Sequence, residues 1–400
     1  MLHENLIEDA KAISGELVTL RRAIHAEPEL GLHTPKTREK VRMALAHLPL
    51  EWREGPSTTG MVAVLKGGAG DGRRVLLRGD MDALPMPEET GLDFASQVAG
   101  TMHACGHDAH TAMLAGAVEL LAKRADRLKG EVLFMFQPGE EGHHGARYML
   151  DDGLLDPLPD AAFALHVFPN APHGTFGGRA GPLLASADQF TLTVRGKGGH
   201  ASLPHETLDP VPVACEIVTA LQAMITRKFS VFDPAVLTVA RISSGTTFNV
   251  VPDNAEIEGT MRSLSAESRQ RLRDNVQLVA SGIASAHGLT CDIDMVEGFP
   301  VTVCDSRAVD LGERVAATMF GAESFLALDN PVMGAEDFSY VLEKVPGAMF
   351  FLGASHLGED WTQCCGIHST RMMLDEAVMP RGAAMLAGFA EAFLAKAFDQ

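Results

Sequence analysis

The sequence predicts an α/β protein, in which a mostly parallel sheet is flanked by helices and a smaller α+β domain is inserted into the chain. In the first part of the chain, short apolar runs that end in polar loops alternate with helical patterns. This alternation is typical of a parallel sheet that is covered on both faces. Near residue 186 the pattern changes to alternating apolar and polar residues, which indicates strands with one solvated face.

Three apolar runs define the predicted sheet, at residues 75–77, 132–136 and 161–165, and each passes directly into a polar loop. A helix between the first two runs carries apolar residues along one face at residues 113–121. In sheets of this kind, functional sites form where strands run out into loops at their carboxyl ends. We therefore expect the three polar loops to lie together.

A chain of 400 residues is too long for one ordinary core, so two domains are expected. The second domain is expected at residues 186–297. The first would comprise residues 1–185 and 298–400, because helical patterns at 306–320 and 376–397 return the chain to it.

The predicted insertion contains about four strands and two helices, which make a compact α+β unit. Strand patterns occur at residues 190–194, 236–242 and 255–261, and one helix is expected at residues 213–225. A second helix should begin after Ser265, because serine is a residue type that caps helix N-termini.

The composition argues against several classes of function. The net charge of -19 would repel a phosphate backbone, so no nucleic-acid partner is expected. No apolar stretch is expected to reach the roughly 18 residues of a membrane span, and the N-terminus lacks the basic start and apolar run of a secretory signal. The expected compartment is therefore the cytoplasm, where the six cysteines should remain thiols.

The strongest chemical signal is the segment HACGHDAH at residues 103–110. Thiolate and imidazole are ligands suited to zinc, manganese, nickel or cobalt. Ligands two residues apart on an irregular segment, such as Cys105 and His107, can point at one ion. Taken alone, the segment could also be a chance cluster ahead of a helix.

Carboxylates and further imidazoles follow other predicted strands. Glu140 and Glu141 come directly after an apolar run, where one carboxylate can bind metal while its neighbour takes a proton from water. His166 ends another run, and His368 lies near the C-terminus. Each alone could be a solvated turn or a structural histidine. Together with Cys105 they supply enough ligands for two ions that share a bridge.

The chain resembles the amidohydrolase family of dinuclear metallopeptidases that includes hippurate hydrolases, bacterial aminoacylases and plant auxin–amino-acid conjugate hydrolases. The resemblance implies an enzyme that hydrolyses the amide bond of an N-acyl amino acid, such as an N-acetyl or N-benzoyl compound. It also implies two divalent ions per subunit, either Mn2+, Zn2+, Ni2+ or Co2+. It runs through nearly the whole chain in family order, and the matching segments are residues 22–29, 78–85, 103–110, 139–142, 198–202, 249–252, 259–262 and 334–338.

The same resemblance implies a ligand set. Cys105 would bridge the two ions, where more distant relatives carry an aspartate. His107 and His166 would complete one metal site, and Glu141 and His368 would complete the other.

Catalytic and substrate-binding roles are implied as well. Glu140 would be the general base toward a metal-activated water and would then protonate the leaving amine. His200, in the inserted domain, would stabilise the oxyanion, reaching into the partner's site in a homodimer or homotetramer. Asn249 and Arg262 would hold the substrate's carboxylate, for which a guanidinium is well shaped. The first domain would thus be the catalytic metal-binding domain and the inserted one a lid or dimerisation domain.

Two aspartates follow the first predicted strand and need separate treatment. We interpret Asp82 as a residue that orients a metal ligand, although a turn cap is the alternative. Asp80 stands where more distant relatives carry a metal-binding histidine, so it is not counted as a ligand.

Other interpretations remain open from the sequence alone. The same chemistry would serve a dipeptidase or carboxypeptidase, because only the pocket on the acyl side separates these activities. A non-catalytic metal-binding module is disfavoured by Glu140, since a structural metal site needs no base. The sequence does not explain His143 and His144, where the family often has glycines, or the pair Cys364 and Cys365.

Overall fold

The computed structural model describes residue 3 and residues 5–399, which form two compact units. The first unit comprises residues 1–183, 303–330 and 337–400, and the second comprises residues 184–302 and 331–336. The second unit is thus inserted into the first. Its return segment, residues 331–336, lies outside the range 186–297 that the sequence suggests for the insertion.

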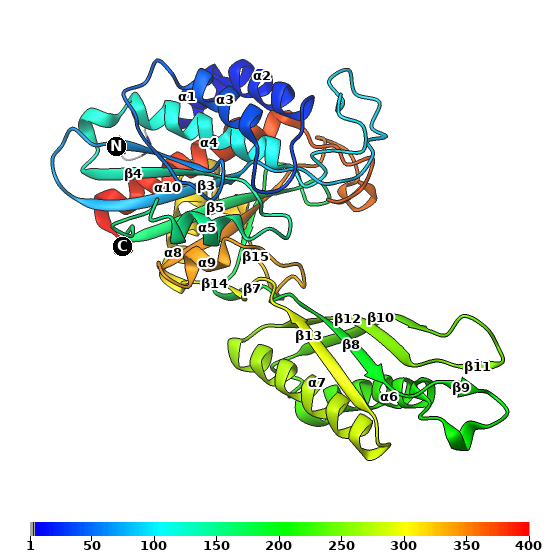
Figure 1. Ribbon diagram of the computed structural model, residues 1–400. Helices are drawn as coiled ribbons and strands as arrows, with labels where there is room; N and C mark the ends of the chain where they lie inside the picture. The colour runs from blue at the N-terminus through cyan, green and yellow to red at the C-terminus, as the bar shows by residue number, and fades with distance from the viewer. Residues whose placement is uncertain (1–2, 4, 400) are drawn as a thin grey trace. The chain divides into compact units, whose positions relative to one another are not determined.

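An eight-stranded sheet forms the centre of the first unit (Figure 1). The strand order is β1-β2-β4-β3-β5-β16-β6-β15, and β4, β3, β5 and β16 run parallel to one another. Antiparallel pairs join β1, β2 and β4 at one side and β16 and β6 at the other. The strands are β1 (Glu51–Glu54), β2 (Met61–Lys66), β3 (Arg73–Asp80), β4 (Gly130–Gln137), β5 (Ala161–Phe168), β6 (Phe176–Gly178), β15 (Phe325–Ala327) and β16 (Gly347–Gly353).

Helices cover both faces of this sheet, which explains why its central strands are continuous apolar runs. Figure 1 shows α2, α3 and α4 on one side and α5 and α9 on the other. Every residue of β16 is buried, as is β3 from Val75 onward. The helices are α1 (Leu6–Ala12), α2 (Ser14–His25), α3 (Pro35–Ala44), α4 (His107–Ala122), α5 (Gly145–Asp151), α8 (Ser306–Phe320), α9 (Ser339–Leu342) and α10 (Met379–Lys396).

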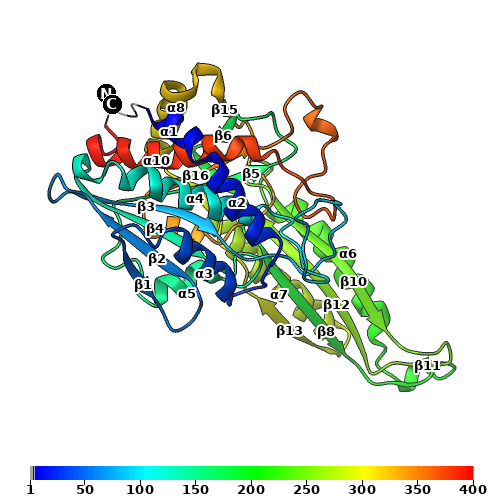
Figure 2. The same cartoon turned by 90° about the horizontal axis from the view of Figure 1, so that it is seen from above.

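One helical stretch, Glu376–Lys396, has the length and hydropathy of a membrane span. The expectation that no stretch reaches this length and apolarity is therefore wrong. However, 89% of its apolar window is buried inside the protein. Its main part, α10, lies beside α4 (Figure 2) and packs against β3 and β5. The stretch is therefore a core helix of the first unit.

The second unit is a four-stranded antiparallel sheet, in the order β10-β12-β8-β13, with two helices. Phe190, Leu192 and Val194 of β8 belong to its core, while the residues between them are more exposed. Ser265 caps the second helix by accepting a hydrogen bond from the N–H of Ser268. These elements confirm the predicted α+β content. They are β8 (Asp188–Arg195), α6 (Pro210–Lys228), β10 (Ala235–Ser244), β12 (Asn254–Ser263), α7 (Ala266–Ala286) and β13 (Thr290–Val296).

Short elements complete the chain. Two-stranded ribbons pair β9 (Gly199–His200) with β11 (Val250–Val251) and β7 (Gly181–Leu184) with β14 (Thr302–Cys304). Short 3-10 turns are η1 (Ala125–Arg127), η2 (Pro204–Glu206), η3 (Ala322–Ser324), η4 (Trp361–Gln363) and η5 (Glu376–Val378).

Candidate active site

Neighbouring strands of the first unit bring the candidate metal ligands to one edge of the sheet. β3 ends at Asp80, and β4 ends three residues before Glu140 and Glu141. His166 lies inside β5 and does not follow it, because the ladder with β16 continues through Phe168. The polar residues meet at the carboxyl ends of parallel strands, where such sheets form their sites.

Cys105 and His107 are held by a tight turn at the start of α4. Gly106 stands between them with a φ of 84°, which L side chains rarely adopt. A Cβ at this position would meet Val167 Cγ2 at 2.3 Å. Glycine therefore lets the turn pass close to β5, and the turn stays next to His166.

Asp82 supports this turn and the Glu140–Glu141 pair together. Its backbone carbonyl accepts a hydrogen bond of 2.8 Å from His107 Nδ1. Its two carboxylate oxygens accept the backbone N–H groups of Glu140 and Glu141, each at 3.0 Å. Because Nδ1 of His107 is the donor, its Nε2 carries the lone pair that a metal ion requires.

Two groups of three candidate ligands share Cys105. The ligand atoms of Cys105, His107 and His166 lie within 4.8 Å of one another, and Cys105 Sγ is 3.4 Å from His166 Nε2. Glu141 and His368 form the second group with Cys105 under the same limit, and 3.3 Å separates Glu141 Oε1 from His368 Nε2. One sulfur is thus near the ligand atoms of both groups.

His107 lies next to two carboxylates of the cluster. Its buried Nε2 has no hydrogen-bond partner among the described residues, and it lies 3.7 Å from Asp80 Oδ2 and 3.8 Å from Glu140 Oε2. Burial lowers the pKa of His107, but Asp80 and Cys105 outweigh this effect and raise the pKa well above its usual value. Burial likewise lowers the pKa of His166. Arg78 already donates to Asp80 Oδ2, so a cation beside His107 Nε2 would lie near Glu140 and would leave both imidazoles neutral.

The pKa values of Cys105 and His368 are both raised, and a bound cation would favour the deprotonated form of each. Burial raises the pKa of the Cys105 thiol. Hydrogen bonds to Cys105 and Glu141 raise the pKa of His368 to about 10. Sulfur, imidazole nitrogen and carboxylate oxygen are donors that zinc and neighbouring transition metals accept. The side chains present therefore fit a metal centre.

Glu140 stands beside both groups of ligands. Its side chain is buried, with 6% of the residue exposed, and its carboxylate is in reach of the His107 ring. Asp82 fixes its backbone N–H, and its backbone carbonyl accepts the N–H of Gly142 at 2.7 Å. A carboxylate held in this way can take a proton from water and transfer it to a leaving group.

A buried ionic cluster lies next to the turn that carries Cys105 and His107, and sequence patterns gave no sign of it. Arg21 Nε and His25 Nδ1, both from α2, donate to Asp108 Oδ2 at 2.6 and 2.8 Å. His25 Nε2 lies 3.1 Å from Glu88 Oε1. Burial lowers the pKa of His25, but Asp108 and Glu88 outweigh it and raise the pKa to about 9. Because Asp108 directly follows His107, this cluster anchors the first turn of α4.

The structure shows the contacts of the four residues that the sequence does not explain, which are His143, His144, Cys364 and Cys365. His144 precedes α5 with a φ of 58°, and its Nδ1 lies 2.9 Å from the hydroxyl of Tyr340. His143 packs its ring against the connection between α2 and α3. Cys364 and Cys365 line a pocket of about 330 Å³ and form no disulfide.

The remaining predicted residues belong to the second unit. His200 of β9 is exposed and pairs with Val250 of β11, so it lies next to Asn249. Arg262 stands near the far end of β12, eight residues beyond Asn254, which is about 26 Å at roughly 3.3 Å per residue. Partial burial lowers the pKa of its guanidinium. Asn249 lies in the segment that leads into the other end of β12, so Asn249 and Arg262 stand at opposite ends of this strand.

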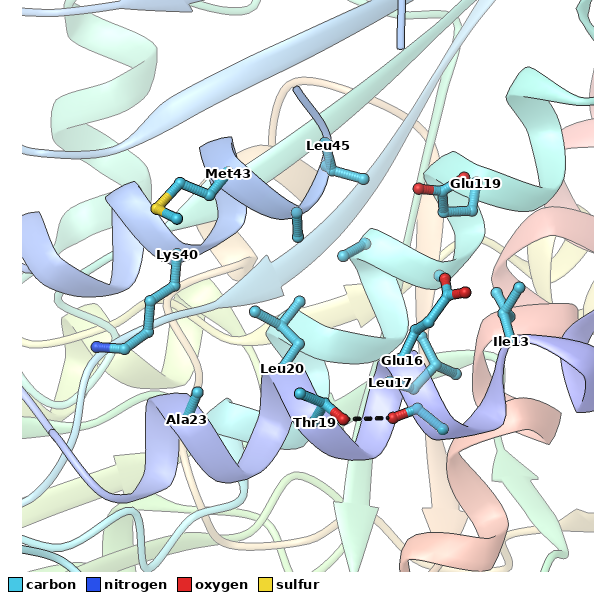
Figure 3. A pocket seen from close by; sticks show the side chains of 14 residues that line it. Ile13, Glu16, Leu17, Thr19, Leu20, Ala23, Lys40, Met43, Leu45 and Glu119 are labelled. Carbon is cyan, nitrogen blue, oxygen red and sulfur yellow. Dashed lines mark hydrogen bonds between the residues drawn. The ribbon is translucent and has the colours of Figure 1, made fainter. Parts of the chain in front are cut away.

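An apolar cavity of about 510 Å³ lies between α2, α3 and α4 of the first unit (Figure 3). Leu17, Leu20 and Leu45 contribute to its walls, and the carboxylates of Glu16 and Glu119 also line it. None of the candidate ligands lines this cavity. It is therefore distinct from the cluster of candidate ligands.

Grouped ligands and a buried carboxylate at a sheet edge are characteristic of metal-dependent hydrolases, and this chain is an enzyme of that class. It belongs to the peptidase family M20/M25/M40, whose model matches residues 76–392. The match confirms the resemblance seen in the sequence and makes the protein a hydrolase of amide bonds.

Curated relatives match this chain over nearly its whole length. N-acetylcysteine deacetylase of Bacillus subtilis (strain 168) is 39% identical over 370 residues, which are 92% of this chain and 94% of the relative. Thermostable carboxypeptidase 2 of Saccharolobus solfataricus is 38% identical over 386 residues, 96% of each chain. IAA-amino acid hydrolase ILR1-like 4 of Arabidopsis thaliana is 36% identical over 382 residues, 94% of this chain and 86% of the relative.

Solved structures confirm the predicted fold class. A putative aminohydrolase from methicillin resistant Staphylococcus aureus has a TM-score of 0.92 at 29% identity and covers 98% of this chain and 100% of its own. The Bacillus subtilis YXEP protein, described as a dinuclear metal binding peptidase from the M20 family, has a TM-score of 0.82 at 35% identity. That match covers 96% of this chain and 99% of the other.

Proposed function

We propose that the protein hydrolyses the amide bond of N-acyl amino acids and releases a carboxylic acid and a free amino acid. The observation that carries the proposal is the pair of ligand groups that share Cys105, with Glu140 beside them. The similarity to a relative named N-acetylcysteine deacetylase supports the choice of substrate class.

Each chain would hold two divalent ions. His107 and His166 would bind one ion, and Glu141 and His368 would bind the other. The thiolate of Cys105 would bind both ions. When bound, the ions would supply Lewis acidity, which polarises the amide carbonyl and makes water a stronger acid. A reducing compartment such as the cytoplasm suits this ligand set, because Cys105 must remain free of disulfides.

Glu140 is the proposed general base. Its carboxylate would take a proton from the attacking water and later deliver it to the nitrogen of the departing amino acid. Both transfers matter because an amide nitrogen is a poor leaving group until it is protonated. The burial of Glu140 and the anchoring of its backbone by Asp82 support this role, since they keep the carboxylate in one place.

We further propose that residues of two copies complete the substrate site in a dimer. His200 and Asn249 share one ribbon, so they would act together, His200 on the developing oxyanion and Asn249 on the substrate. Arg262 would bind the substrate's carboxylate from the other copy. The placement of Asn249 before one end of β12 and of Arg262 near the other end supports this division.

A carboxypeptidase or dipeptidase activity is the second candidate. Its support is the relative named thermostable carboxypeptidase 2, which is 38% identical over 96% of this chain. Hydrolysis of a terminal peptide bond would use the same ligands and the same base. The two candidates differ in the acyl group, which is a simple acid in one and an amino acid or peptide in the other.

The test is the release of free amino acid from N-acetyl, N-benzoyl and dipeptide substrates, with manganese or zinc added and with a chelator control. We expect chelator-sensitive release that is fastest with the N-acyl compounds. Faster release from the dipeptides would favour the second candidate. No release from any substrate with either metal would contradict both.

A further inference from the structure

Val167 follows the proposed ligand His166. Its backbone N–H and its backbone carbonyl both form hydrogen bonds with histidine side chains. Its carbonyl accepts a bond of 2.8 Å from His166 Nδ1, which turns His166 Nε2 toward Cys105. Its N–H donates a bond of 2.8 Å to His110 Nε2. His110 lies on α4 and belongs to neither group that contains Cys105.

The sheet offers the N–H of Val167 no strand partner on this side. The ladder between β3 and β5 ends where Arg78 pairs with Ala164, because β3 leaves the sheet at Asp80. A buried N–H without a partner costs about 1–3 kcal/mol. His110 therefore takes the place of the missing strand directly beside the ligand.

Asp80 determines which nitrogen of His110 carries the proton. A carboxylate only accepts, so His110 Nδ1, at 2.6 Å from Asp80 Oδ1, must be the donor. His110 Nε2 then has the lone pair that accepts the Val167 N–H. Arg78 donates to the other oxygen, Asp80 Oδ2, at 2.5 Å, so both oxygens of Asp80 are engaged.

We infer that His110 is a positioning residue that fixes His166 through Val167, and that Asp80 holds His110 in the required tautomer. This inference rests on the proposed role of His166 as a metal ligand. It assigns a purpose to the aspartate at position 80, where more distant relatives carry a metal-binding histidine. Asp80 acts here through the imidazole of His110, one step removed from the metal.

Two substitutions separate the parts of this pathway. In Asp80→Asn, Arg78 can only donate, so the amide oxygen stays with Arg78 and the amide NH2 turns to His110. That NH2 forces the proton onto His110 Nε2, where it opposes the N–H of Val167. His110→Phe keeps a ring in place and removes both hydrogen bonds.

We would measure zinc binding to the metal-free protein by competition with a chelating dye. Each variant should bind at least one of the two zinc ions roughly 10–100-fold more weakly than the wild type. The losses of the two single variants should not add in full in the double variant, because Asp80 reaches Val167 only through His110, although its carboxylate also lies 3.7 Å from His107 Nε2. If Asp80→Asn does not fold, the zinc affinity of His110→Phe alone tests the inference.

Asp152→Asn is the matched control. Asp152 accepts hydrogen bonds from Ser57 at 2.7 and 3.0 Å outside the cluster, so its loss should lower the melting temperature and leave zinc affinity unchanged. The inference is overturned if the two test variants behave like this control, or if their effects on zinc affinity add in full. A wild-type protein that binds no zinc, manganese, nickel or cobalt would instead overturn the proposed function, and the inference with it.

Discussion

The sulfur of Cys105 belongs to both groups of candidate ligands. It is 3.4 Å from His166 Nε2, and it shares a second group with Glu141 and His368. Loss of this side chain should therefore weaken the binding of both ions, whereas loss of any other ligand should weaken mainly the binding of one ion.

Cys105→Ala should lower the affinity for both ions by more than roughly 100-fold, beyond the loss expected when a supporting contact is removed. Metal content after dialysis against a buffer with a weak chelator measures this loss. Cys304→Ala is the control, because Cys304 is also a buried thiol but is hydrogen-bonded to Met349 away from the cluster. Two ions retained in Cys105→Ala would show that the thiol is only a core residue.

His25 should make the stability of the metal-free protein depend on pH. Its pKa is raised from 6.5 to about 9, because Asp108 and Glu88 outweigh the effect of burial. The protonated ring therefore stabilises the folded state fully below pH 6.5, and this contribution is lost as the pH rises through about 9.

The difference in unfolding free energy between wild type and His25→Gln should shrink between pH 7 and pH 10, by at most about 3 kcal/mol. Urea unfolding at a series of pH values measures this difference. Comparison with the variant removes the contributions of other titrating groups. A difference that does not change with pH would mean that His25 is neutral in the folded protein.

At the scale of elements, the turn into α4 depends on one glycine. Gly106→Ala should destabilise the protein by at least about 1–2 kcal/mol from its backbone conformation alone, and the clash with Val167 adds to this. The metal content should fall as well, since Cys105 and His107 flank the turn. Thermal unfolding and metal analysis of the same samples test both effects.

Gly282→Ala is the control for that substitution. Gly282 lies inside α7, and a Cβ there would meet nothing within 4 Å. The change should stabilise the protein by about 0.5–1 kcal/mol. A Gly106→Ala protein that is as stable and as metal-rich as the wild type would show that the turn tolerates another conformation.

The sequence predicted the elements whose patterns are local. Strands β3, β4 and β5 were recognised as apolar runs, and α7 was recognised from its cap at Ser265. The fully buried β16 was missed, and β5 extends past His166, because the extent of a strand depends on partners that are remote in sequence. The antiparallel β1 and β2 at the edge of the sheet carry no signal that distinguishes them from parallel strands.

The candidate site divides in the same way. The thiol, imidazole and carboxylate side chains were found because their types and spacing are visible in the sequence, yet their roles remain predictions. Among the residues that support them, Asp82 was singled out in the sequence, whereas Arg21 and His110 were not. Arg21 lies 87 residues from Asp108, and His110 lies 57 residues from Val167. Such contacts are created by folding, and no local pattern of residues encodes them.

At the scale of the whole molecule, the proposal that two copies complete one site makes a prediction for mixtures. Glu140→Gln and His200→Ala should each be inactive as pure proteins. In a hybrid dimer, one site combines the intact Glu140 of one subunit with the intact His200 of the other. A mixture that has exchanged subunits should therefore recover roughly a quarter of the wild-type activity.

Activity that stays at the level of the pure variants after exchange would contradict this sharing, provided that hybrid dimers are detected. The hybrids can be identified by native mass spectrometry after one variant is labelled with a heavy isotope. A wild-type protein that is monomeric in the same measurement would also contradict it.

The most direct test of the proposed hydrolysis is Glu140→Gln, measured for metal content and turnover on one sample. Glutamine keeps the shape of Glu140 but cannot accept the proton of the attacking water. We predict that the variant keeps both metal ions and releases amino acid at least about 10²–10⁴-fold more slowly than wild type. Substantial turnover with metal bound would contradict the assignment of the base, and loss of turnover together with metal would make Glu140 a ligand.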